Sequence, residues 1–138
     1  MRLRLAIPCE REQLAPLLDA IDNALLAHAV AAQLRHDLRL IAEEVACNAI
    51  DHGHCDRGAS PRELVVSLVR EDGKLHVEFR DNGHPFDPLS HPLPDLDADI
   101  LDRPIGGLGV HLVRELAHSV RYAREEPYNV LHVVLLAR

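Results

Sequence analysis

The chain has 138 residues, a formal net charge of −7 and 47% hydrophobic residues. This length is typical of one domain with its own core. The negative charge and the lack of a long Lys/Arg run argue against binding to a nucleic-acid backbone. No apolar stretch is long enough to span a membrane, and no signal peptide follows Met1. We therefore expect one cytoplasmic domain over residues 1–138 that works through protein partners.

The first half of the chain predicts one strand followed by two helices. Apolar and polar residues alternate from Arg2 to Ile7, which is the period of a strand with one buried face, and Pro8 closes it. A helical stripe then runs from Glu10 to about His28. A second helix is predicted from about Gln33 to His52, and it stops at Gly53, a typical C-terminal cap.

The second half predicts two hairpins separated by a long loop and a helix. We expect strands over 63–70 and 75–79 around a turn at 71–73, a loop from 85 to 104 with at most a short helical piece, a helix after 109, and strands over 119–124 and 130–136 around a turn at 127–129. The element order predicts an α+β fold, a two-layer sandwich of a mixed five-stranded β-sheet against about three α-helices.

Two polar residues interrupt the apolar stripe of the second helix. Leu34, Leu38 and Ile41 follow the spacing of a buried face, and Asn48 continues it. Glu44 lies four residues before Asn48, so both side chains project from the same side of the helix. Because Asn is a poor interior helix former and a buried carboxylate is costly, this pair indicates a ligand.

Two further motifs follow in the chain. Asp81-Asn82-Gly83 ends a predicted strand, and Gly106-Gly107-Leu108-Gly109 begins a predicted helix. Glycines at a helix start let backbone amides approach an anion, which the helix dipole also favours. Each motif alone is also compatible with an ordinary turn or a tight loop.

In this order the stretches EEVACNAIDHG, DNGHPFDP and GGLGVHLVREL resemble the N, G1 and G2 boxes of the GHKL (Bergerat-fold) ATPases. Within that superfamily they are most similar to the small anti-sigma-factor serine/threonine kinases of bacteria, the RsbW type. Pro85 stands where the superfamily's second DxGxG glycine would be, and the anti-sigma branch commonly departs there in a similar way.

The resemblance implies a site for ATP and Mg²⁺. Asn48 would be the magnesium ligand, which suits an ion that prefers oxygen ligands, and Glu44 would be the general base. Asp81 would accept the exocyclic amine of adenine, and Gly83 would leave space for the base. The implied lid spans about 84–106. The remaining implied nucleotide contacts are His52, Phe86, Arg103, Gly106, Gly107, Leu108 and Gly109.

Arg103 is the only Lys or Arg between Arg80 and the glycine run. It is therefore our candidate for reaching the terminal phosphate, with a catalytic role beside Glu44.

The function implied by the resemblance is partner switching. The protein would phosphorylate a STAS-domain anti-sigma-factor antagonist and would sequester a sigma factor or an equivalent regulator. It would be a homodimer, for which the predicted first strand offers an edge. This reading includes no direct contact with nucleic acid or membrane.

Two other functions fit parts of the sequence. A non-catalytic, ATP-sensing GHKL module would sequester a regulatory protein through lid closure, although it would not need Glu44. A zinc-dependent interaction protein could use His52, His54 and Cys55, but these ligands lack the paired, regular spacing of typical tetrahedral sites.

Overall fold

A computed structural model describes residues 1–52, 61–90 and 107–136. The elements in chain order are β1 (Arg2–Pro8), η1 (Arg11–Gln13), α1 (Leu14–Ala27), α2 (Ala32–His52), β2 (Glu63–Glu71), β3 (Lys74–Asp81), η2 (Pro88–Ser90), α3 (Gly107–Leu116), β4 (Ser119–Glu125) and β5 (Tyr128–Leu136), where η marks a 3-10 helix. Among the described residues, no helix combines the length and apolar character that a membrane crossing needs. The α+β fold with about three helices is confirmed.

The five strands form one sheet in the order β1-β2-β3-β5-β4, and every neighbouring pair is antiparallel. Our expectation of a mixed sheet was therefore wrong in this detail. Strands β3 and β4 run in the same direction, since each is antiparallel to β5. They are not neighbours because β5 folds back from its hairpin and inserts between them. A β5 placed outside β4 would have left a parallel pair in the sheet.

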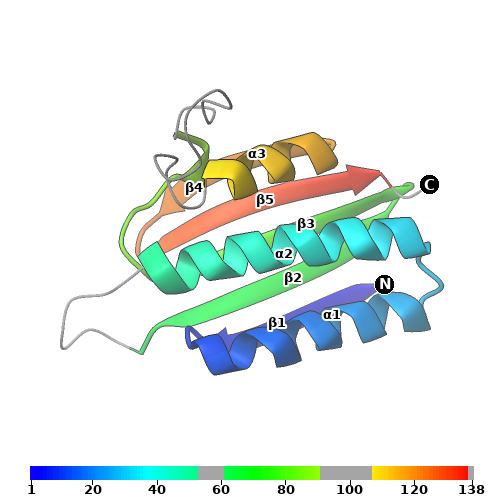
Figure 1. Cartoon of the computed structure of the whole chain (residues 1–138), viewed down its shortest axis with the longest axis horizontal. Coiled ribbons are helices and arrows are strands. Elements are labelled where there is room, and N and C mark those ends of the chain that lie inside the picture. The colour runs from blue at the N-terminus through cyan, green and yellow to red at the C-terminus, as the bar shows by residue number, and fades with distance from the viewer. Residues whose placement is uncertain (53–60, 91–106, 137–138) are drawn as a thin grey trace.

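The three helices cover one face of the sheet, and Figure 1 shows them as a single layer in front of the strands. The core lies between the two layers and contains the buried apolar side chains of α1 and α2 and the inward-facing residues of the strands. On β1, Leu3 and Leu5 pack against this core, whereas Arg2 and Arg4 are exposed on the opposite face. The predicted alternation of the first strand is confirmed.

The five predicted strands are confirmed, but β2 continues to Glu71, β3 runs from Lys74 to Asp81, and β5 begins at Tyr128, each beyond the predicted bounds. The turn between β2 and β3 lies at Asp72 and Gly73, whose φ angles are 52° and 73°, as a tight hairpin of this twist requires. We expected Tyr128 and Asn129 in a turn, but both belong to β5, where they pair with Glu125 and Arg124. This shift of two residues brings Asn129 into the sheet.

Helix α1 ends in a left-handed residue that is not glycine. Ala29 has a φ of 58°. Its N–H bonds to the carbonyl of Leu26, and the N–H of Val30 bonds to the carbonyl of Leu25, which is the pattern of a Schellman cap. Leu25 and Val30 are both buried, so the cap directs the chain back into the core at a position where an alanine Cβ is strained.

Replacing Ala29 with Gly should raise the free energy of unfolding by about 1 kcal/mol, because glycine adopts positive φ without a Cβ clash. Urea denaturation would measure the change. The control is Ala24→Gly within α1, which should lower stability by about the same amount. A loss of stability in Ala29→Gly would show that this cap does not form in solution.

Candidate functional site

A cavity opens between α2, the ends of β3 and β5, and the segment that follows β3. The described residues that line it are mostly apolar and include four polar side chains: Asn48, Asp81, Tyr122 and Asn129. The apolar lining consists of Val45, Ala49, Phe79, Phe86, Pro88, Leu89, Val113 and Leu131. An apolar cavity with a few converging polar groups is the usual form of a small-molecule site.

Helix α2 brings Asn48 to the wall of this cavity. Asn48 is half-buried, and within the described part of the chain its carboxamide makes no hydrogen bond. The apolar stripe of α2 explains this position, since Leu38 and Ile41 are fully buried in the core while Asn48 follows on the same side, where the core gives way to the cavity. Its oxygen is available to a ligand.

Glu44 lies one turn before Asn48 on α2 and does not line the cavity. The pKa of this half-buried carboxyl is raised above its ordinary value. Partial burial is the largest cause, and the negative charges of Glu43 and Asp51 add to it. Glu44 is therefore a carboxylate with an increased tendency to take up a proton, placed beside the cavity.

At the end of β3, one oxygen of Asp81 is used within the protein and the other is not. Oδ1 accepts hydrogen bonds from the N–H of Gly83 at 2.9 Å and from Nδ2 of Asn129 at 3.1 Å. Among the described residues, Oδ2 accepts no hydrogen bond. Since Asp81 lines the cavity and Gly83 is buried beside it, Oδ2 is a charged acceptor available to a bound molecule.

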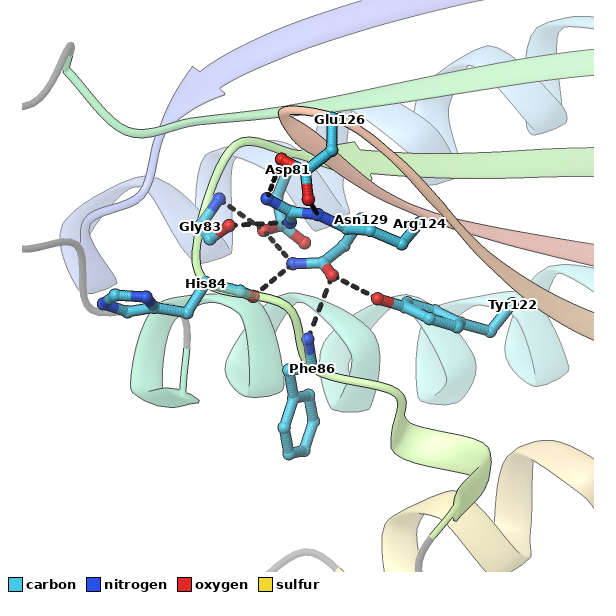
Figure 2. A network of polar contacts seen from close by, with 8 residues as sticks. All are labelled: Asp81, Gly83, His84, Phe86, Tyr122, Arg124, Glu126 and Asn129. Carbon is cyan, nitrogen blue, oxygen red and sulfur yellow. Dashed lines mark hydrogen bonds and ion pairs between the residues drawn. The ribbon is translucent and has the colours of Figure 1, made fainter.

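Asn129 is the centre of a polar network that Figure 2 shows from close by. It is only 5% exposed. Its Nδ2 donates to Asp81 and, at 2.7 Å, to the carbonyl of His84. Its Oδ1 accepts from the N–H of Phe86 at 3.0 Å and from the Tyr122 hydroxyl. Two donor and two acceptor positions of the amide are thus filled.

The segment from Gly83 to Leu89 is held at both ends by arginines. Arg124 donates to the carbonyl of Gly83 at 2.9 Å, and Arg114 of α3 donates to the carbonyl of Leu89 at 2.5 Å. Asp87 accepts the N–H of Leu89 at 2.8 Å at the start of η2. Residues 84–89 of the predicted lid are thus bonded to the sheet and α3, and Phe86 and Leu89 form cavity wall.

The remaining predicted residues are placed only in part. Gly107, Leu108 and Gly109 are the first residues of α3, and Val113 on the same helix lines the cavity. His52 is the last residue of α2. Arg103, Gly106 and the predicted lid from 91 to 106 lie outside the described residues, as do His54 and Cys55 of the zinc hypothesis.

Sequence reasoning missed Tyr122, Asn129 and the two arginines that hold the segment after β3. A signal was present for Asn129, because it is a polar residue directly before the apolar run Val130–Leu136. We interpreted it as a turn residue. Nothing local predicted that Arg114 and Arg124 hold the segment after β3, since the carbonyls of Leu89 and Gly83 that they bond are distant in sequence.

The sequence model of a protein family, the histidine kinase-like ATPase domain, matches residues 7–135 of the chain. The chain therefore belongs to this family of ATPase domains, and its α+β fold agrees with this membership.

Individual proteins that are similar to the chain include a serine/threonine-protein kinase and a histidine kinase domain. The serine/threonine-protein kinase BtrW of Bordetella bronchiseptica is 29% identical over 111 residues, which are 80% of this chain and 77% of that protein. The histidine kinase domain from the blue-light activated histidine kinase EL346 of Erythrobacter litoralis superposes with a TM-score of 0.56 at 19% identity, over 95% of this chain. The chain spans 62% of that structure's length, and the likeness concerns the fold alone.

Proposed function

We propose that this protein is an ATP-dependent protein-serine/threonine kinase of a bacterial partner-switching system. It phosphorylates a STAS-domain anti-sigma-factor antagonist and acts as an anti-sigma factor in the cytoplasm. The observation that carries the proposal is the convergence of two available oxygen acceptors, on Asn48 and Asp81, in one apolar cavity of a histidine kinase-like ATPase domain. The similarity to a serine/threonine-protein kinase over most of the chain supports protein phosphorylation.

The Asp81 side of the cavity fits the base of ATP. A purine base is flat and largely apolar, and it therefore suits a cavity lined by Phe79, Phe86 and Leu131. Oδ2 of Asp81 can accept a hydrogen bond from its exocyclic amine, and a charged acceptor makes this bond stronger than a neutral one would. Gly83 adds no side chain beside the carboxylate. This end of the cavity therefore favours adenine.

The Asn48 side fits a magnesium ion and the phosphates. Its carboxamide oxygen is a ligand type that Mg²⁺ prefers, and one protein ligand suffices because water and phosphate oxygens complete the shell. When bound, the ion neutralises phosphate charge. We assign the phosphates to the N-terminal end of α3, where Gly107 and Gly109 offer backbone N–H groups together with the helix dipole. Gly106, the residue before this helix in the sequence, remains a proposed phosphate contact on the resemblance alone. Arg103 is our candidate for the terminal phosphate.

Glu44 is the proposed general base that accepts the proton of the substrate serine hydroxyl. Phosphoryl transfer depends mainly on positioning and on neutralising negative charge, and the base orients the attacking oxygen. The raised pKa of Glu44 increases its proton affinity at the position where a serine would approach Asn48. A non-catalytic ATP sensor would gain nothing from a partly buried carboxylate of raised pKa at this point, so we prefer the kinase.

The proposed partners are the antagonist, a sigma factor or equivalent regulator, and a second copy of the chain. A net charge of −7 suits contacts with proteins better than contacts with nucleic acid. Strand β1 lies at an edge of the sheet and pairs only with β2 among the described strands, and an edge strand supports the homodimer we propose. None of these contacts involves a membrane.

The first test is a calorimetric titration of the protein with ATP, with and without magnesium. We expect binding that requires Mg²⁺. In Asn48→Ala the affinity for Mg-ATP should fall at least about tenfold, as expected for the loss of an ion ligand. The control is Asn23→Ala on the exposed side of α1, which should bind as the unaltered chain does. Absence of ATP and ADP binding in both conditions would contradict the proposed site.

A further inference from the structure

Asn129 acts on Asp81 through an amide whose orientation the backbone determines. An Asn side chain can in principle present either its oxygen or its nitrogen to a neighbour. Here the carbonyl of His84 can only accept and the N–H of Phe86 can only donate. Asn129 bonds to both, with Nδ2 towards His84 and Oδ1 towards Phe86. Turning the amide over would place its oxygen against the carbonyl oxygen of His84 and its NH₂ group against the N–H of Phe86, and neither pair can form a hydrogen bond.

This fixed orientation directs an N–H of Asn129 at Oδ1 of Asp81. The N–H of Gly83 also points at Oδ1, so two donors hold the same carboxylate oxygen. The carboxylate is thereby prevented from rotating, and Oδ2 is the oxygen that is left to the cavity. Figure 2 shows this arrangement, with Asn129 between Asp81 and the backbone of His84 and Phe86.

We propose that Asn129 is a specificity-determining positioning residue, which makes the site select a base that carries an exocyclic amine although Asn129 itself does not touch the nucleotide. Its four hydrogen-bond positions are already filled by protein groups, so none is left for a ligand. Selectivity for the amine comes from Oδ2 of Asp81, held in place by Asn129. This inference rests on the proposed function, since it assumes ATP in the cavity.

The test compares binding of Mg-ATP with binding of the magnesium complex of purine riboside 5′-triphosphate, which lacks the exocyclic amine. The unaltered protein should prefer ATP by about tenfold to a hundredfold, the worth of one hydrogen bond to a charged acceptor. In Asn129→Asp and Asn129→Ala the preference should fall to about threefold or less, since Asp81 keeps only the Gly83 N–H and its carboxylate can rotate. If Asn129 only stabilised the fold, its replacement would weaken the binding of both ligands equally and would leave the ratio of the two affinities unchanged.

The matched control is Val133→Ala on the same strand. Val133 is fully buried and does not line the cavity, so its truncation destabilises the fold without altering the polar network. The ratio should stay at the value of the unaltered protein. Asn129→Asp places an oxygen against both Asp81 and His84, and if it does not fold, Asn129→Ala decides the test.

Three results would overturn the inference in distinguishable ways. If the unaltered protein binds ATP but not in preference to the analogue, Asp81 does not select the amine. If it prefers ATP and both Asn129 variants keep that preference, Asn129 does not position Asp81. If it binds neither ligand, the proposed function itself is wrong, and the inference falls with it.

Discussion

Replacing Glu44 with Gln should leave Mg-ATP binding within about twofold and reduce phosphotransfer to the proposed STAS-domain antagonist about a hundred- to ten-thousand-fold. The variant keeps the size of the side chain but cannot take a proton. Calorimetry and single-turnover phosphorylation would measure the two effects separately. Glu44 lies outside the cavity lining, which is why binding should persist. Phosphotransfer at the unaltered rate would show that Glu44 is not the base.

The same substitution should stabilise the fold at neutral pH. The pKa of Glu44 is raised in the folded protein, mainly by burial, so its ionised form costs stability once the pH exceeds the ordinary carboxyl pKa. Gln removes this cost, and we expect Tm at pH 7 to rise by about 1 to 3 °C. The difference in Tm between the variant and the unaltered protein should shrink as the pH falls through the pKa of Glu44 in the folded protein. It should vanish below the ordinary carboxyl pKa, where Glu44 is protonated in both the folded and the unfolded protein.

Glu43→Gln is the control for the loss of phosphotransfer. Glu43 is exposed on α2 and raises the pKa of Glu44 by its charge. Its neutralisation should preserve phosphotransfer and shift the acidic limb of the pH–rate profile to lower pH. A loss of activity in Glu43→Gln equal to that in Glu44→Gln would mean that the negative charge of this helix turn, rather than one base, is what matters.

Replacing Asp81 with Asn should reverse the base preference of the site from ATP towards inosine triphosphate. The donors of Gly83 and Asn129 that now meet Oδ1 would select the oxygen of the new amide, so its NH₂ group would replace Oδ2. That group repels the 6-amino group of adenine and can donate to the 6-oxo group of hypoxanthine. ATP affinity should fall at least about a hundredfold, while inosine triphosphate should bind more tightly than ATP.

Competitive titration of the two nucleotides would check this reversal. Asp72→Asn is a suitable control, because Asp72 is exposed in the β2–β3 turn and asparagine tolerates its positive φ. It should keep the ATP preference. Equal weakening of both nucleotides in Asp81→Asn would mean that Asp81 supports the segment after β3 without reading the base.

The elements and the motif residues could be predicted from the sequence because they depend on local properties. Apolar periodicity indicated α2 and the strands, and the positive-φ turn at Asp72-Gly73 follows from residue type. Asn48 and Asp81 could be identified because polar residues at those places conflict with a buried stripe and a strand end. Both line one cavity, as the resemblance implied.

The antiparallel sheet and the contact of Asn129 with Asp81 could not be predicted, because both depend on which segments meet in space. The alternation of apolar and polar residues along each strand would be the same whether β5 lay between β3 and β4 or beyond β4 at the edge of the sheet. Asp81 and Asn129 are 48 residues apart in the chain, and they meet only because β5 inserts next to β3 and pairs them in register. The sequence by itself determined the helices, the strands and the acceptor groups for a ligand. Only the tertiary structure decided which oxygen of Asp81 is left for the ligand, since that depends on donors from a distant strand.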